Sequence, residues 1–323
     1  MKAVRAHGPT RRDFLEQAGR AGALGLLAGF PTAWLQAAAP ARLRIGYQIF
    51  GWGRYFPSQW WKGAAAVGAL GFRGIEGEYT IAELYEGREG EFDEGMQRCG
   101  TRLAALYSTS DLERTRERHE NMRKNLQAAA FCKRMGSRMV VLGGTEAKGK
   151  EPAMFETYAR EANDIGKRML ETYGVKFGVH PHVGSLVETR EEIARVMDGT
   201  DPRYFFLAPD TGHLIAGGSD PVEVFQVYRE RIVHAHLKDY ARPSVPGGRG
   251  AFLPLGQGQV DFPALIRILT AAGFDGWLDV ELDGGRGIDP AEVARGARDY
   301  VINNLKLTLD GDAGTAGGAG LRR

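Results

Sequence analysis

The sequence predicts an α/β protein built as a single (β/α)8 TIM barrel. Two observations lead to this fold class. Eight short apolar runs alternate with longer segments of helical periodicity, and each strand and helix unit takes about 30 to 40 residues, the usual size of a βα repeat. With a leader and a tail set aside, the 323 residues leave room for one barrel-sized domain.

Eight apolar runs, bounded by Gly or polar residues, are each predicted as a buried parallel strand. They lie at residues 43–50, 74–79, 103–108, 139–143, 176–180, 204–209, 232–237 and 277–282. A doubly wound open sheet would alternate in the same way. Its dinucleotide-binding form needs a G-x-G-x-x-G motif after the first strand, and this chain has none there. The alternation therefore favours the closed barrel.

Helical periodicity marks the segments between strands, among them residues 120–135, 153–173 and 262–272. Other helices begin with capping signals: Thr189 and Glu192 form a capping box, and Asp220 and Asp289 each precede a proline. A Pro- and Gly-rich stretch at 243–258 is predicted as a long loop over the barrel mouth. We assign residues 42–309 to the barrel and expect 310–323, rich in Gly and Ala, to be a disordered tail.

Residues 1–41 resemble a twin-arginine (Tat) export signal. Arg11 and Arg12 precede an uncharged stretch at 21–39, and small residues suited to a signal peptidase follow it. A membrane anchor or an amphipathic surface helix is the alternative, but Pro31 and several glycines weaken a membrane-spanning segment. We therefore expect export to the periplasm, with the Tat translocase as a partner and cleavage between residues 37 and 41.

The charge balance excludes some classes of partner. Lys and Arg number 42 and Asp and Glu 40, so the formal charge is +2, and several arginines belong to the leader. We expect no broad phosphate-binding face and no nucleic-acid partner. Cys99 and Cys132 each lie near the end of a predicted helix and are expected to be free thiols, with a disulfide as the less favoured alternative. Homo-oligomer formation stays open.

Five of the seven histidines stand at three consecutive predicted strand ends, where the loops of a barrel open. The fifth strand ends with His180 and His182, and the sixth with Asp210 and His213. The seventh ends with His234, His236 and Lys238, and the eighth with Glu281. Imidazole and carboxylate ligands together suit a divalent transition ion and argue against Ca²⁺ or an all-thiolate site. Each histidine alone could be a hydrogen-bonded core residue, and Lys238 could be a surface residue paired with Asp239. The clustering favours a metal site.

Several motifs then follow in a fixed order: HPHVG at 180–184, VET at 187–189, DTGHL at 210–214, AGGSDP at 216–221, HAHLKD at 234–239 and GQGQVDF at 256–262. The chain resembles the inosose dehydratases of the xylose isomerase-like superfamily, which also holds sugar phosphate isomerases and epimerases. The resemblance covers most of residues 44–305. It implies one divalent metal ion, Mn²⁺ or Co²⁺ first and Zn²⁺ or Fe²⁺ as alternatives, held by His180, Asp210, His236 and Glu281.

The resemblance also implies substrate contacts from His213 and Lys238, and two departures from the family pattern bear on the reaction. In the related keto-sugar epimerases, the fifth-strand ligand is a glutamate that doubles as acid and base, whereas this chain has His180. This difference favours loss of water over epimerisation. The export signal is the second departure, because inosose dehydratases are cytosolic enzymes.

We expect a keto-inositol-like substrate to bind the metal through its ketone and a neighbouring hydroxyl, and to lose a proton and then a β-hydroxyl through a metal-held enediolate. The base is Glu281 or His182, with Lys238 or His213 stabilising the enolate or protonating the leaving group. The alternatives are a secreted keto-sugar isomerase or epimerase, a 3-keto-glycoside lyase, and a non-catalytic periplasmic sugar-binding protein.

Three further residues are predicted as substrate contacts. Trp52 lies in a Gly-flanked loop after the first strand, where an aromatic ring could stack on a sugar. Glu76 and Glu78 end the second strand in alternation and therefore share a face. Either could bind a sugar hydroxyl or simply pair with Arg73.

Overall fold

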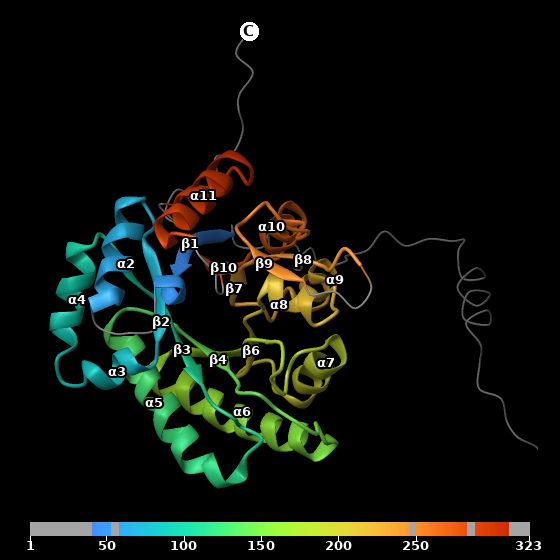
Figure 1. The fold of residues 1–323 in the computed structure, drawn as a ribbon. Helices are drawn as coiled ribbons and strands as arrows, with labels where there is room; N and C mark the ends of the chain where they lie inside the picture. The colour runs from blue at the N-terminus through green and yellow to red at the C-terminus, as the bar shows by residue number, and fades with distance from the viewer. Residues whose placement is uncertain (1–40, 53–57, 246–249, 283–287, 310–323) are drawn as a thin grey trace, which may run out of the picture. The chain divides into compact units, whose positions relative to one another are not determined.

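The computed structural model describes residues 41–52, 58–245, 250–282 and 288–309, and these lie in one compact unit (Figure 1). Apart from Ala41, the predicted export signal lies outside the described residues, as does the predicted tail at 310–323. In the described ranges, none of the helices has the length and apolar character needed to span a membrane.

Eight parallel strands form a nearly closed barrel, which confirms the predicted fold class. The strands are β1 (Arg42–Gln48), β2 (Gly74–Glu78), β3 (Arg102–Thr109), β4 (Met139–Gly143), β5 (Lys176–Val179), β6 (Phe206–Leu207), β7 (His234–Leu237) and β10 (Asp275–Val280). Their order in the sheet is β6-β5-β4-β3-β2-β1-β10-β7. Parallel bridges from Leu207 to Ile232 and from Asp210 to His236 join the two ends of this sheet. Each strand overlaps one predicted apolar run.

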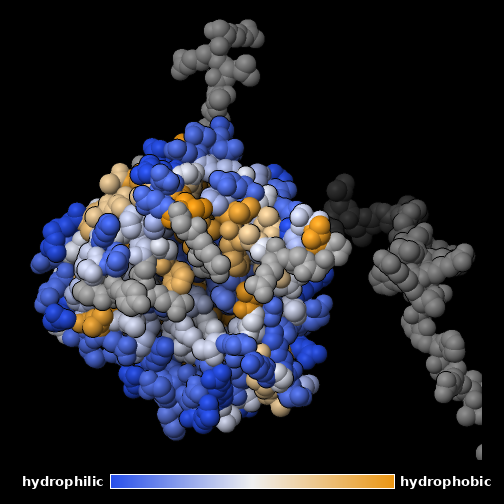
Figure 2. Space-filling model, in the orientation of Figure 1, coloured by the Kyte–Doolittle hydropathy of each residue, from blue (hydrophilic) through white to orange (hydrophobic). Residues whose placement is uncertain are grey.

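The helices surround the strands as a ring (Figure 1). They are α2 (Ser58–Ala69), α3 (Thr80–Leu84), α4 (Glu89–Arg98), α5 (Arg118–Arg134), α6 (Pro152–Tyr173), α7 (Arg190–Gly199), α8 (Thr211–Ala216), α9 (Pro221–Tyr228), α10 (Phe262–Ala271) and α11 (Pro290–Asn303). The predicted caps are confirmed: Thr189 and Glu192 form the capping box of α7, and Asp220 and Asp289 cap α9 and α11. In the same view, Figure 2 shows hydrophilic residues around the rim and more hydrophobic ones toward the middle.

The interior of the barrel has two unlike halves. On the side of β3 to β6 it is filled by a small apolar cluster of Ala105, Met139, Val141 and Ala208. On the side of β1, β2, β7 and β10, buried polar side chains take the place of the branched apolar residues that usually fill such a barrel. These polar side chains are Gln48, Glu76, His234, His236 and Asp279. Because buried polar groups are costly unless they are paired, this half must hold a connected network.

The stretch at 243–258 is more ordered than a plain loop, so that prediction was wrong in part. The chain forms an antiparallel pair of β8 (Asp239–Ala241) and β9 (Ala251–Leu253), and residues 246–249 between them lie outside the described residues. Cys99 and Cys132 are both free, and Cys132 is buried. The favoured expectation of free thiols is therefore confirmed.

Candidate metal centre and active site

The four predicted metal ligands come from the ends of four strands of the barrel. His180 follows β5, Asp210 follows β6, His236 belongs to β7 and Glu281 follows β10, and all four are buried. One potential ligand atom from each of His180, Asp210 and His236 lies within 4.8 Å of the other two. Glu281 Oε2 lies 2.7 Å from His236 Nδ1. The fold therefore gathers all four side chains at one point.

The electrostatics of this cluster suit a divalent ion. His180 Nδ1 is buried and has no hydrogen-bond partner among the described residues. Burial, together with the nearby charges of His236 and His213, holds the pKa of His180 well below its usual value, so its ring is neutral. Burial alone would raise the pKa of Asp210, but the positive charges of Lys238 and His213 lower it. A neutral imidazole with a free nitrogen beside an ionised carboxylate is a donor set that fits a transition metal ion.

Asp210 uses its two carboxylate oxygens for different tasks. Oδ1 accepts hydrogen bonds from the backbone amides of Gly212, at 2.8 Å, and His213, at 2.9 Å, and so caps α8. Oδ2 faces the cluster, 2.9 Å from Lys238 Nζ. The Thr211 hydroxyl donates to the Lys238 carbonyl at 2.7 Å and ties the start of α8 to the end of β7. The DTGH segment at 210–213 thus orients one carboxylate oxygen and one imidazole toward the site.

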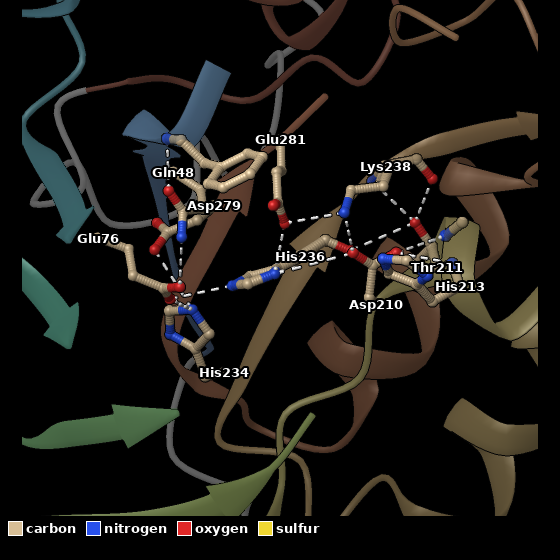
Figure 3. Close-up of polar contacts among 12 residues, drawn as sticks. Gln48, Glu76, Asp210, Thr211, His213, His234, His236, Lys238, Asp279 and Glu281 are labelled. Carbon is tan, nitrogen blue, oxygen red and sulfur yellow. Dashed lines mark hydrogen bonds and ion pairs between the residues drawn. The ribbon is translucent and has the colours of Figure 1, made fainter. Parts of the chain in front are cut away.

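Glu76 contacts the His236 ring from one side (Figure 3). His236 Nε2 lies 3.0 Å from Glu76 Oε2, while the Nδ1 of the same ring faces Glu281 and Asp210. An imidazole whose outer nitrogen binds a carboxylate presents the other nitrogen, correctly oriented, to a metal. Glu76 Oε2 also lies 2.8 Å from His234 Nε2, which is 3.3 Å from Asp279 Oδ2. A chain of alternating carboxylates and imidazoles therefore runs from Glu281 into the barrel.

The charges in this chain support one another. Burial alone would raise the pKa of Glu76, but His236 and His234 lower it to about 2. Burial alone would lower the pKa of His234, but Asp279 and Glu76 raise it to about 9. Glu76 is thus an anion and His234 a cation at neutral pH. Each buried charge is stabilised by its neighbours, as a polar barrel interior requires.

A pocket opens beside the four predicted metal ligands, and all four predicted catalytic residues line it. Its walls are formed by Gln48, Phe50, Glu78, Tyr107, His180, His182, His213, Lys238 and Glu281. Lys238 Nζ lies 3.1 Å from Glu281 Oε2 as well as close to Asp210. Because Lys238 is buried, the alternative of a surface residue is wrong.

His182 is held as a neutral imidazole at the pocket wall. Its Nδ1 lies 2.8 Å from the Val183 carbonyl oxygen, which can only accept, so the neutral ring carries its lone pair on Nε2. Burial and the charge of His213 lower the pKa of His182, which keeps the ring neutral. The rings of His182 and His213 lie 3.8 Å apart between centroids. Two imidazoles thus stand side by side at the pocket wall.

Asp239 organises the loop that closes one side of the site. Its Oδ2 accepts from the amides of Gly256 and Gly258, at 2.9 and 2.8 Å, and its Oδ1 from those of Tyr240 and Val260. A Cβ at Gly258 would overlap the Asp239 carboxylate, so the position needs glycine. The loop brings the Phe252 ring within 4.8 Å of the His213 ring. The GQGQVDF segment at 256–262 thus contributes backbone amides that bind the Asp239 carboxylate.

The family described as xylose isomerase-like TIM barrel matches residues 64–303. The chain belongs to this family. The inosose dehydratase of Clostridium botulinum strain Alaska E43 is 30% identical over 264 residues, which is 73% of this chain and 87% of that relative.

Two solved structures share the fold of this family. A probable 3-DHS dehydratase from Bacillus anthracis has a TM-score of 0.66 and 17% identity, over 81% of this chain and 99% of the other. The IolI protein, solved with a bound zinc atom, has a TM-score of 0.66 and 18% identity, over 80% of this chain and 96% of the other.

Two residues predicted as substrate contacts do not line the pocket of this family member. Trp52 ends the short 3-10 helix η1 (Ile49–Trp52) and is buried against Gly63 of α2, whereas Phe50 of the same short helix lines the pocket. Glu76 is fully buried beneath the cluster, because His234 and His236 draw its carboxylate into the barrel. Glu78, two residues further along the same strand, does line the pocket.

Three residues of the site were missed in the sequence. Asp279, near the end of β10, lies two residues before Glu281, and this spacing alone could have placed it on the inner face. Tyr107 lies near the end of β3, with its ring 5.3 Å from that of His180, and the strand-end rule could have found it. Gln48 donates to Glu76 Oε1 at 3.2 Å, and no pattern in the sequence singled it out.

Proposed function

We propose that this protein is a divalent-metal-dependent carbon–oxygen lyase that removes water from a keto-inositol or a similar keto-polyol. The observation that carries the proposal is the convergence of His180, Asp210, His236 and Glu281 beside a pocket lined by His182, His213 and Lys238. The similarity to an inosose dehydratase, over most of both chains, supports the substrate class.

The donor set accepts Mn²⁺, Co²⁺, Zn²⁺ or Fe²⁺, because imidazole and carboxylate ligands together suit all four ions. We propose Mn²⁺ or Co²⁺ first. When bound, such an ion polarises a ketone and makes the neighbouring C–H bond more acidic. Glu76 supplies the fixed negative charge behind His236 that keeps this ligand oriented.

The protein's own groups would then move the protons. His182 Nε2 takes the proton from the carbon next to the ketone, because its Nδ1 is already engaged with Val183. The β-hydroxyl leaves as water with a proton from His213 or Lys238, both of which line the same pocket. The products are an unsaturated ketone and water. Glu281 is the less favoured base, since its Oε2 already faces His236 and Lys238.

A second candidate is a lyase for 3-keto-glycosides, in which an alkoxy group leaves in place of hydroxide. The twin-arginine pattern at Arg11 and Arg12 favours it, because an exported enzyme would meet glycosides outside the cytoplasm. On this proposal the protein works in the periplasm after passage through the Tat translocase.

The test is turnover by the full chain loaded with Mn²⁺, with a keto-inositol and a 3-keto-glucoside offered separately and the products followed by NMR. Loss of water from the keto-inositol supports the dehydratase, and release of the alcohol from the glucoside identifies the glycoside lyase. His182→Gln should abolish either reaction. His119→Gln, an exposed histidine of α5, is the matched control and should not. Absence of any turnover by protein with stoichiometric metal contradicts both proposals.

A further inference from the structure

A second cavity lies at the opposite end of the barrel, where the strands begin. It has a volume of about 380 Å³ and is lined by the first residues of β1, β3, β5 and β10 and by residues just before β4 and β7. Five of its lining side chains are arginines or lysine: Arg42, Arg44, Arg102, Arg138 and Lys176. His234 also lines the cavity and is a sixth cation, paired inside the barrel with Glu76 and Asp279. Asp275 is the one carboxylate among the lining residues. This end of the barrel therefore concentrates positive charge in a hollow.

The positive charge is largely unmatched. Arg44 pairs with Asp275, with 2.6 Å between Nη2 and Oδ1. In the described part of the chain, the side chains of Arg42, Arg102, Arg138 and Lys176 form no ion pair with a carboxylate within 4.0 Å. Burial lowers the pKa of Lys176; Asp275 opposes this effect and Arg138 adds to it. Folding thus brings like charges together at a cost in free energy, which a bound anion would offset.

Trp277 orients two of the arginines. The guanidinium carbons of Arg44 and Arg102 lie 5.5 and 5.1 Å from the centre of its ring. The ring itself is accommodated by Gly74 on β2, where a Cβ would overlap it. Stacking restrains a guanidinium group while its N–H edges stay available for bidentate bonds to phosphate or carboxylate oxygens. The arginines are thus partly organised in advance for an oxyanion.

We propose that this cavity binds a small organic or inorganic polyanion that carries phosphate or carboxylate groups. The cavity lies at the beginnings of the strands and the proposed metal ligands at their ends, and His234 is the lining residue that connects the two regions, through Glu76. The basic residues surround a hollow and form no stripe along a surface, which matches a compact anion better than a nucleic-acid backbone.

The test is calorimetric titration of the full chain with inorganic pyrophosphate and, separately, with citrate. Binding of either at a stoichiometry of one supports the site, and the tighter of the two identifies the preferred group. Arg138→Ala, an exposed side chain, and Lys176→Met, which keeps the length of the stem, should each weaken binding about tenfold. Arg116→Ala removes the same charge from an exposed position after β3, at the other end of the barrel, and should leave the affinity unchanged.

The outcomes that overturn the proposal are equally clear. Absence of heat with both anions would show that the cavity binds neither class. An equal loss of affinity in Arg138→Ala and Arg116→Ala would show a diffuse effect of net charge in place of a site. Neither result depends on the metal or on turnover, so this proposal can fail while the lyase proposal stands.

Discussion

Glu76 lies outside the pocket and contacts His236, one of the proposed metal ligands. The two ring nitrogens of His236 face different partners, Glu76 on one side and Glu281 with Asp210 on the other. The pattern of strand ends identified His236 in the sequence, but it also suggested a substrate contact for Glu76. Which glutamate of the pair faces the pocket depends on depth within the barrel, and alternation along β2 shows only that both point inward.

Glu76→Gln tests this positioning role. We expect the affinity for Mn²⁺ to fall about 10- to 100-fold, because His236 loses its anionic partner. The variant should also be less stable by about 3 kcal/mol, since the buried imidazoles lose their counter-charge. Equilibrium dialysis of the metal and chemical denaturation measure the two effects. Glu78→Gln, which alters the pocket wall alone, should keep the affinity for the metal and change only turnover. Equal metal affinity in the wild type and Glu76→Gln would refute the role.

The pH profile of turnover tests His182 as the base. Because burial and His213 lower the pKa of His182, its neutral, active form persists below the usual pKa of a histidine. The rate should therefore be flat near pH 7 and fall on acidification through that lowered pKa. His182→Gln should lower the turnover rate at least about 100-fold, which is the loss expected when a general base is removed, while the metal stays bound. An unchanged acid limb in this variant would assign the base to another group, with Glu281 the first candidate.

At the scale of elements, α8 and the metal site depend on the same carboxylate. Asp210 Oδ1 caps the helix and Oδ2 faces the cluster. Asp210 was predicted as a metal ligand, and its cap on α8 was not among the predicted caps. In the structure one side chain serves both.

Two substitutions separate these tasks. Asp210→Asn keeps a capping oxygen but loses the charge, so it should lose most of its affinity for the metal with little change in α8. Asp210→Ala should lose the affinity and, in addition, about 1 kcal/mol of stability from the missing cap. Thermal unfolding of both metal-free variants is the measurement. Identical melting temperatures would show that the cap contributes nothing.

The strands and helices were predictable because their signals are local. Each of these signals affects only residues a few positions away in the sequence. Examples are the apolar runs, the cap at Thr189 and the prolines after Asp220 and Asp289. The β8 and β9 pair was not predictable in this way. Asp239 holds it through amides up to 21 residues away, and a Pro- and Gly-rich composition does not reveal such contacts.

At the scale of the whole molecule, the two ends of the barrel differ in charge and in what they could bind. The arginines and the lysine of the second cavity are spread from Arg42 to Lys176 along the chain, so the composition, with its formal charge of +2, indicated only that no broad phosphate-binding face was to be expected. Only closure of the barrel brings the strand starts together. The same closure brings the imidazoles and carboxylates together at the other end.

The buried charges also make stability depend on pH. His234 has its pKa raised to about 9, above the value of about 6.5 expected for an unfolded chain. The contribution of His234 to the stability of the fold is therefore fully present below about pH 6.5 and is lost as the pH rises through about 9. Urea denaturation of metal-loaded protein should show this decline, and His234→Gln should flatten it, whereas His119→Gln should keep it. If the stability of the wild type and of His234→Gln changed with pH in the same way, the charge network would be contradicted.

The most direct test of the central claim is deuterium exchange into a keto-inositol in D2O, with and without Mn²⁺, by the wild type and His236→Ala. If the metal centre acidifies the carbon next to the ketone, deuterium will enter that position only when both Mn²⁺ and His236 are present. Exchange that persists without the metal or in His236→Ala would contradict the account, as would no exchange by the metal-loaded wild type.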